Sequence, residues 1–380
     1  MDAFETLQKY YSQRDLGARE WKEKGGKVVG FTCTNTPEEL LYAANLLPIR
    51  LVGDPYEEIT LGGLYIEDIT SPFVTSIVDL LAKGKYRHID GFFLTHSSDS
   101  FVRLYYNLLA FPEIKPSHLH WLCVPHGRNQ RMFKFLVSEL ERVKKEIEDT
   151  YRTEISDDAL IKAIKVYNEN RQLLREVDNL RREDPPQITG QQAFQIIGSS
   201  FFMSKEKHTK LLQQFLEEVK RQPKRHEGVR LYLSGSIQDN LQLVSLIEKL
   251  GAVVVSDDLC TGARYFADDV MPSPELSLLE NMAEYLMWKA PCPRVSPTTY
   301  KVDYLAKTVQ EARADGVIFY FLRWEDDHGW QYPDEKAKLD ELGIPSILFE
   351  QQEYRLAAPE QLRTRIETFI ETIKQRKPRE

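Results

Sequence analysis

Short runs of β-branched and aromatic residues alternate with longer segments of helical periodicity along most of this 380-residue sequence. The first half contains the runs KVVGFT, DGFFLT and LHWLCV, and the second half contains VRLYLS, AVVVSD, GVIFYFL and PSILFE. Strands that alternate with helices are typical of parallel sheets covered by helices on both faces. We therefore expect an α/β protein with two Rossmann-like or flavodoxin-like parallel-sheet domains.

A long helical region separates the two sets of strands. The segments FKFLVSELERVKKEIEDTY and DDALIKAIKVYNENRQLLREVDNLRR carry apolar residues at helical spacing, with charged residues between them. We expect three parts: an N-terminal α/β domain over 1–126 with a leading helix, a helical connector or subdomain over 127–226, and a C-terminal α/β domain over 227–380.

Several helix boundaries follow from capping chemistry. The leading helix is expected to run to about Lys24. Thr36 is a plausible N-cap with Pro37 at the first helical position, and Ser71-Pro72 opens a further helix. Near the C-terminal strands, we expect a helix over roughly 333–342.

The charge and hydropathy of the chain exclude two classes of partner. The net charge is −8, whereas nucleic-acid binding requires a clustered basic surface. No apolar run approaches the roughly 20 residues needed to span a bilayer. The N-terminus carries early acids and no apolar signal core. We expect a cytoplasmic protein that binds neither nucleic acid nor membrane.

Polar loops follow the predicted strands, and ligands of open parallel sheets bind outside the carboxyl ends of strands. The loops to consider are 32–36, 96–99, 234–236, 257–262 and 323–328. Each loop, taken alone, is explained by Ser, Asn and Asp residues that cap the following helix. Five such loops in one chain favour at least one real site. The candidate cleft residues are Cys33, Asn35, Thr36, His96, Asp99, Asp257, Cys260, Arg264 and His328.

The four cysteines are Cys33, Cys123, Cys260 and Cys292, and no pair has C-x-x-C spacing. A disulfide framework is not expected in a chain of this size and compartment. A buried apolar thiol is the favoured interpretation of each. A metal site built from Cys33, Cys260 and Cys292 is the alternative.

Several sequence blocks together resemble one enzyme family. In order they are CTNTPEELLYAANLLPIRLVG, SPFVTS, DGFFLTHSSDS, LYLSGS, VVSDDLCTGARYF, APCPRVSP, DGVIFYFLRWEDD and GIPSILFE. They cover nearly the whole chain and are similar to the subunits of 2-hydroxyacyl-CoA dehydratases and benzoyl-CoA reductases. The resemblance implies two α/β domains plus helices, and pairing of subunits as dimers. It also implies a [4Fe–4S] cluster held between the domains by three cysteines per subunit. An ATP-dependent iron–sulfur activator would supply a low-potential electron for reduction of an acyl-CoA thioester.

The chain departs from this family pattern where the cluster ligands are expected. The C-P-F, C-D and F-C-D motifs of the family correspond here to segments in which Ser71, Ser98 and Glu325 replace the cysteines. Hydroxyl and carboxylate oxygens are much poorer ligands for an iron–sulfur cluster than thiolates. We therefore assign no cofactor to this chain, although [4Fe–4S] is the cofactor of the family.

Three functional interpretations remain open. In the first, the chain is an accessory subunit that pairs with a homologous cluster-bearing subunit as a heterodimer, or with itself as a homodimer. In the second, the former cluster cavity binds a hard metal ion or a small polar ligand. In the third, the chain is a stand-alone binding protein or a hydrolase that uses His96, Ser98, Asp99, Glu325 and His328.

The resemblance also gives geometric expectations. Ser71, Ser98 and Glu325 should converge in one cavity between the two α/β domains. Asp257, Cys260 and Arg264 should lie on the second domain near that cleft, with Arg264 paired to a carboxylate.

Overall fold

The first of two parallel sheets is built from the N-terminal third of the chain. In the computed structural model, which describes residues 2–221, 225–235, 237–357 and 359–376, this sheet has the strand order β2-β1-β3-β4. All its strand pairings are parallel. The strands are β1 (Lys27–Phe31), β2 (Leu46–Arg50), β3 (Gly91–His96) and β4 (Leu119–Cys123). Most of these strand residues are buried, as expected for a sheet covered on both faces.

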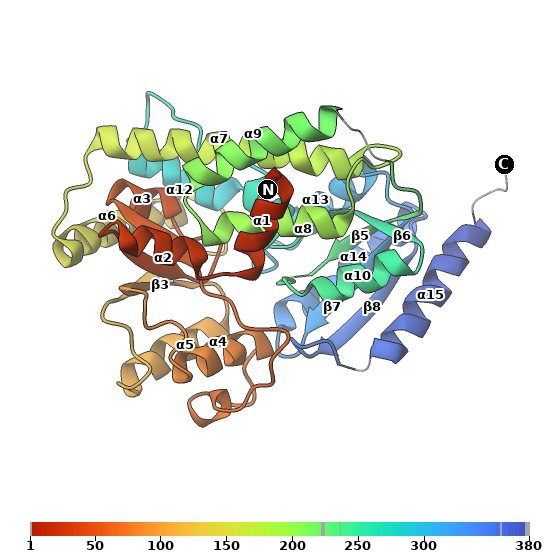
Figure 1. The fold of residues 1–380 in the computed structure, drawn as a ribbon, viewed down its shortest axis with the longest axis horizontal. Helices are drawn as coiled ribbons and strands as arrows, with labels where there is room; N and C mark the ends of the chain where they lie inside the picture. Colours follow the sequence, from red (N-terminus) through yellow and green to blue (C-terminus); the bar gives the residue numbers. More distant parts are fainter. Residues whose placement is uncertain (1, 222–224, 236, 358, 377–380) are drawn as a thin grey trace.

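The second sheet repeats this arrangement in the C-terminal part. Its order is β6-β5-β7-β8, again with parallel pairing throughout. The strands are β5 (Val229–Ser234), β6 (Ala252–Asp257), β7 (Gly316–Leu322) and β8 (Ser346–Gln352). Two parallel sheets flanked by helices confirm the predicted fold class (Figure 1).

Four helices connect the two sheets. They are α6 (Gln130–Tyr151), α7 (Asp157–Arg182), α8 (Gly190–Ser199) and α9 (Lys205–Arg221). Helices α7 and α9 run side by side along one edge of the molecule and extend toward both sheets (Figure 1). The caps of α7 match its sequence: Ser156 accepts a hydrogen bond from the Ala159 amide, acids fill the first turn, and arginines fill the last.

Two buried arginines of α7 fix its position relative to both sheets. Arg171 forms an ion pair with Glu39, in the helix that precedes β2. Arg181 forms an ion pair of 2.6 Å with Asp257, at the end of β6. Because both pairs are almost fully buried, loss of one partner would leave an uncompensated charge in the interior. Helix α7 therefore fixes the two α/β units relative to each other through one buried ion pair to each.

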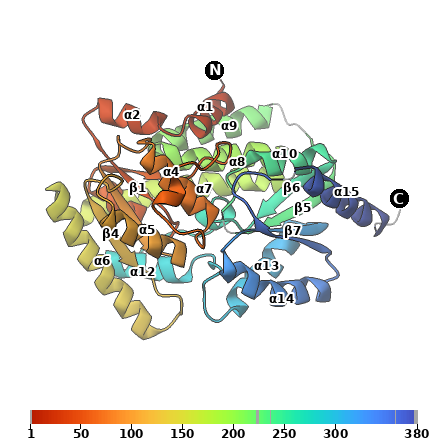
Figure 2. The same ribbon diagram turned by 90° about the horizontal axis from the view of Figure 1, so that it is seen from below.

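The remaining helices cover the sheets. They are α1 (Ala3–Ser12), α2 (Leu16–Glu23), α3 (Glu38–Ala43), α4 (Pro72–Ala82), α5 (Asp99–Ala110), α10 (Leu241–Lys249), α11 (Ala263–Phe266), α12 (Leu278–Trp288), α13 (Thr299–Glu311), α14 (Asp326–Glu341) and α15 (Pro359–Arg376), with short 3₁₀ turns η1 (Gly62–Leu64) and η2 (Ser200–Phe202). Seen from below, α6 and α12 lie on the side of the first sheet, and α13 and α14 on that of the second (Figure 2).

Three predicted boundaries are wrong. The leading helix is two helices, because the chain leaves helical geometry at Gln13 and starts again at Leu16. Thr36 is not an N-cap; its hydroxyl lies 3.0 Å from the Thr95 hydroxyl, and Pro37 takes the cap position of α3. Helix α14 begins at Asp326 rather than near Pro333, so this proline lies inside the helix. Because α14 starts at Asp326, Glu325 takes the N-cap position of this helix.

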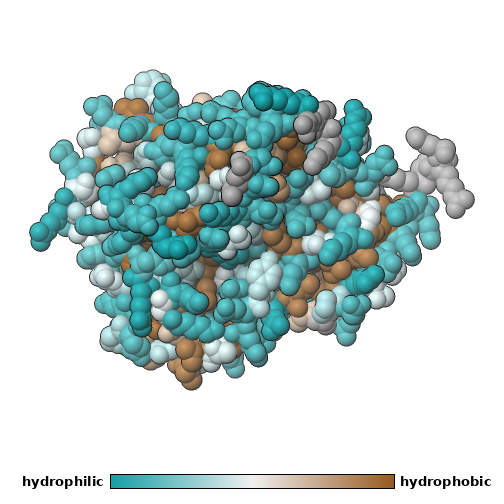
Figure 3. Space-filling view, in the orientation of Figure 1, coloured by the Kyte–Doolittle hydropathy of each residue, from teal (hydrophilic) through white to brown (hydrophobic). Residues whose placement is uncertain are grey.

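The face seen in Figure 3 is mostly hydrophilic, with apolar side chains scattered in small groups. Within the described ranges, no helix has the length and apolar character needed to cross a bilayer.

Candidate functional site

A cavity of about 370 Å³ is lined by loops that follow strands of both sheets. The first sheet contributes the loop after β1 and the loop between β3 and α5. The second contributes the loop after β6 and the first turn of α14, and a segment after α12 completes the wall. This cavity, called the central cavity below, lies where ligand sites of parallel sheets are found.

Ser71, Ser98 and Glu325 all occupy N-cap positions of helices. Ser71 caps α4, Ser98 caps α5 and Glu325 caps α14. The Ser71 hydroxyl donates a hydrogen bond of 3.0 Å to the Glu325 carboxylate, and both Ser98 and Glu325 line the central cavity. The structure thus brings the three residues to one region between the sheets. Three helix N-termini meet there, and each contributes a partial positive charge.

Burial controls the ionisation of Glu325. Desolvation raises the pKa of the Glu325 carboxyl to about 8, while the bond from Ser71 and the Arg264 cation act in the opposite direction. The group is therefore largely protonated at neutral pH. A protonated carboxylic acid in a cavity can both donate and accept a hydrogen bond.

His328, one turn into α14, also lines the cavity. It is only 5% exposed, and its Nε2 atom has no hydrogen-bond partner among the described residues. Desolvation, helped by the Arg264 and Lys301 cations, holds the pKa of His328 well below its usual value. The imidazole is neutral, and one buried polar atom is left for a ligand or a water molecule.

Both arginines and aspartates line the cavity, and the aspartates are Asp99, Asp326 and Asp327. Arg50, at the end of β2, donates hydrogen bonds of 2.9 Å to the Cys260 carbonyl and 3.2 Å to the Cys260 thiol. Arg264 is buried and donates to the Pro291 carbonyl at 3.2 Å. No carboxylate ion pair of Arg264 within 4.0 Å is present in the described part of the chain, contrary to the pairing expected from the sequence.

Three thiols line the same cavity, namely those of Cys33, Cys260 and Cys292. Burial raises the pKa values of Cys260 and Cys292. Within the described ranges, no group of three His, Cys, Asp or Glu side chains is arranged to hold one metal ion. This donor set does not fit a [4Fe–4S] cluster, which needs thiolates held at converging positions.

The other candidates are distributed differently. Asp99 lines the cavity with an exposed carboxylate 3.4 Å from Arg294. Asn35 and His96 line a smaller neighbouring pocket, where the His96 ring stacks on Trp121. No hydrogen bond joins Ser98 to His96 or His328 in the described structure; the Ser98 hydroxyl instead accepts the Phe101 amide at 3.4 Å. This arrangement does not assemble a nucleophile and base.

Two candidates have structural roles away from the cavity. Asp257 is fully buried, pairs with Arg181, and accepts the Leu259 and Ala263 amides, which fixes the turn after β6. Thr36 is buried against Thr95 and lines neither pocket. Residue 236 of the loop 234–236 lies outside the described residues.

The sequence interpretation missed Arg50, Lys289 and Arg294. Arg50 carried a usable signal, because an arginine inside the apolar run LLPIRLV is buried and needs a partner. Lys289 and Arg294 follow α12, and their place beside β1 and β3 depends on tertiary packing.

Comparison with known proteins identifies the family of this chain. The family described as 2-hydroxyglutaryl-CoA dehydratase, D-component, matches residues 33–373. This match covers β2 to β8 and the helices between the two sheets, and it begins just after β1 ends at Phe31.

The chain belongs to this family.

Relatives of the dehydratase family match over nearly their whole length. The chain is 26% identical to the (R)-phenyllactyl-CoA dehydratase beta subunit of Clostridium sporogenes, over 93% of this chain and 94% of that protein. It is 24% identical to the (R)-2-hydroxyglutaryl-CoA dehydratase beta subunit of Acidaminococcus fermentans, over 90% and 92%. It is 25% identical to a subunit of the benzoyl-CoA reductase of Thauera aromatica, over 98% of each chain. The resemblance found in the sequence blocks is thereby confirmed.

Proposed function

We propose that this chain is an accessory subunit of a 2-hydroxyacyl-CoA dehydratase or benzoyl-CoA reductase complex, and that it holds no [4Fe–4S] cluster of its own. It pairs with a homologous cluster-bearing subunit in the cytoplasm, and an ATP-dependent iron–sulfur activator supplies the electron to that partner. The acyl-CoA substrate is reduced on the partner, while this chain completes the dimer and the surroundings of the substrate.

The donor set around the central cavity supports this proposal most directly. Two hydroxyls and one carboxyl group, those of Ser71, Ser98 and Glu325, stand where the resemblance expects thiolates. Ser71 and Glu325 already satisfy one another through a 3.0 Å hydrogen bond. A hydrogen-bonded pair of hard oxygen donors is a poor replacement for soft thiolates on iron.

Coexpression with a cysteine-complete homologue and its activator tests the pairing. We expect a heterodimer in size-exclusion chromatography with light scattering, carrying about four iron atoms, the content of one [4Fe–4S] cluster. Twice that iron content, or a chain that shows dehydratase activity without the homologue, would refute the accessory role.

A second candidate function is supported by His328. Its buried Nε2 atom without a partner, beside three helix N-termini and buried arginines, suits a small polar or anionic ligand better than a hard cation. Titration of the isolated chain with Mg²⁺, Mn²⁺ and Zn²⁺ distinguishes a cavity that binds a metal ion from one that binds a small polar ligand. If the former cluster cavity binds a polar ligand, we expect no saturable binding of these ions.

A further inference from the structure

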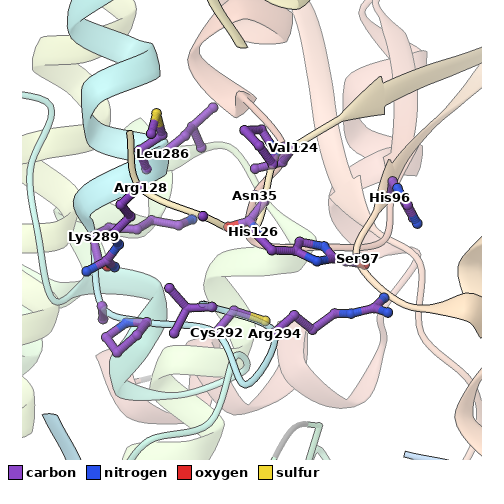
Figure 4. A pocket seen from close by; sticks show the side chains of 16 residues that line it. Asn35, His96, Ser97, Val124, His126, Arg128, Leu286, Lys289, Cys292 and Arg294 are labelled. Carbon is purple, nitrogen blue, oxygen red and sulfur yellow. The ribbon is translucent and has the colours of Figure 1, made fainter. Parts of the chain in front are cut away.

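A small pocket beside the central cavity is lined by three cationic side chains. It lies at the carboxyl ends of β1, β3 and β4, and the segment after α12 closes it. Figure 4 shows Lys289 and Arg128 together on one side of the pocket, with the side chains of Asn35 and His126 near its centre. We call it the basic pocket.

The charged side chains that line the basic pocket are all cations. Lys289, Arg128 and Arg294 all line the basic pocket, and none of its described lining residues is an aspartate or glutamate. Buried cations are normally paired, because removing a charge from water is costly. Arg294 pairs with Asp99 and Asp327 outside the pocket wall, whereas neither Lys289 nor Arg128 has an ion pair in the described part of the chain. These two unpaired cations favour the binding of an external anion.

Lys289 shows this most clearly. It is only 7% exposed, and its ammonium donates to the Thr34 carbonyl, but no carboxylate of the described chain lies within 4.0 Å of it. Desolvation lowers the pKa of Lys289 to about 8. Cys33 and Glu39 act in the opposite direction, but the Glu39 carboxylate is already bonded to Arg171. The charge of Lys289 thus remains largely uncompensated.

Arg128 is held in position without an ion pair. Its guanidinium lies over the rings of Tyr300 at 4.5 Å and Trp288 at 5.2 Å, and Nη2 donates to the Lys289 carbonyl at 3.0 Å. Its Nε atom is buried without a partner among the described residues. Stacking on two aromatic rings fixes the plane of the guanidinium and leaves N–H groups free to bind an oxyanion.

Further hydrogen-bond donors complete the site. The Ser97 hydroxyl and Arg294 Nη1 are buried and unpartnered within the described structure. Burial and the Arg294 cation lower the pKa of His126 to about 4, so its ring is neutral and carries one N–H donor. The pocket encloses about 40 Å³, and since one buried water needs roughly 10–15 Å³, a group of carboxylate or phosphoryl size fits.

We propose that the basic pocket binds one oxyanion group, phosphoryl or carboxylate, through Lys289, Arg128 and the donors around them. Ser97, Cys292 and Arg294 line both the basic pocket and the central cavity. A ligand anchored by its anionic group in the basic pocket therefore reaches the central cavity with its remaining atoms. The site does not depend on the accessory role of the chain.

Calorimetric titration of the isolated full chain with inorganic phosphate, acetate and coenzyme A, at constant ionic strength in chloride, tests the proposal. We expect saturable binding of at least one anion, weakened about tenfold or more in R128Q and K289M, the loss expected for one charge-assisted hydrogen bond. The control K145Q removes a lysine of α6 whose side chain is 77% exposed, and should bind like the wild type.

The three anions identify the source of the oxyanion. Coenzyme A binding at least tenfold tighter than phosphate assigns the site to the phosphates of a nucleotide-containing ligand. Equal binding of both assigns it to free phosphate, and preference for acetate assigns it to a carboxylate. Absence of saturable binding for all three, or unchanged affinity in both variants, would overturn the proposal.

Chemical labelling gives a second readout if K289M does not fold. In the wild type, the anion that binds should slow reductive methylation of Lys289, followed by peptide mass spectrometry, because an ion-paired ammonium has a smaller fraction of free amine. In R128Q the protection should be lost. Equal methylation rates with and without the anion in the wild type would also count against the site.

Discussion

Ser71 and Glu325, 254 positions apart in the sequence, are joined by a 3.0 Å hydrogen bond between the starts of α4 and α14. The bond connects one helix from each α/β unit. It therefore links the two halves of the molecule at the wall of the central cavity. Its two members are among the three residues that the sequence resemblance places at cluster-ligand positions.

This bond should be measurable by a double-mutant cycle. Ser71→Ala should lower the free energy of unfolding by about 1 kcal/mol, because Glu325 loses a donor. In the Glu325→Ala background, which removes the acceptor, the same substitution should cost less, and the difference is the coupling energy. Urea denaturation of the four proteins gives the values. Equal costs in both backgrounds would mean that the bond contributes nothing to stability.

Glu325 should also make stability depend on pH. Its folded pKa of about 8 lies above the ordinary value of 4.5, so the unfolded state ionises first as pH rises. The wild type should lose stability between about pH 5 and pH 8 relative to Glu325→Gln, which does not ionise. The gap between their melting temperatures should widen over this range and level off above it. A gap that stays constant from pH 5 to 9 would contradict the raised pKa.

The buried ion pairs of α7 give a third prediction. Arg171→Met leaves Glu39 buried without its cation and should cost about 3–5 kcal/mol. The double substitution Arg171→Met/Glu39→Gln should recover much of this loss, because no charge is then left unpaired. The exposed pair Lys145–Asp149 on α6 is the matched control, and Lys145→Met should change stability by less than about 1 kcal/mol. If the single and double variants are equally unstable, the loss comes from packing rather than from charge.

The cavity thiols should be slow nucleophiles. Burial raises the pKa values of Cys260 and Cys292, so little thiolate is present at pH 7. Iodoacetamide should label both far more slowly in the native chain than in urea, as followed by peptide mass spectrometry. Addition of Zn²⁺ should leave the native rates unchanged. Rapid labelling that Zn²⁺ suppresses would instead indicate a thiolate metal site.

Much of the fold was predictable because its signals are local. The predicted bounds of α7, 157–182, agree with the structure residue by residue, since Ser156, the first-turn acids and the final arginines mark both ends. The parallel sheets followed from alternating strands and helices. Helix α14 was placed too late, over roughly 333–342, whereas it begins at Asp326 with two acids in its first turn and Pro333 inside the helix.

The candidate site was only partly predictable. Loops after strands pointed to Ser98, Cys33 and His328, which line the central cavity. Asp257 has the same local pattern, yet Arg181, from a helix 76 positions away, draws it into an ion pair. The basic pocket was not foreseen, because Arg128 and Lys289 come from segments 161 positions apart that only tertiary packing brings together.

Iron and acid-labile sulfide in the isolated chain, purified without oxygen, test the central claim most directly. We predict neither iron nor sulfide after reconstitution, and no charge-transfer absorption in the visible range. The triple variant Ser71→Cys/Ser98→Cys/Glu325→Cys should take up a cluster under the same conditions, and the exposed Ser138→Cys variant should not. A cluster in the unaltered chain would contradict the account, because either the oxygen donors or the thiols of Cys33, Cys260 and Cys292 would then be holding iron.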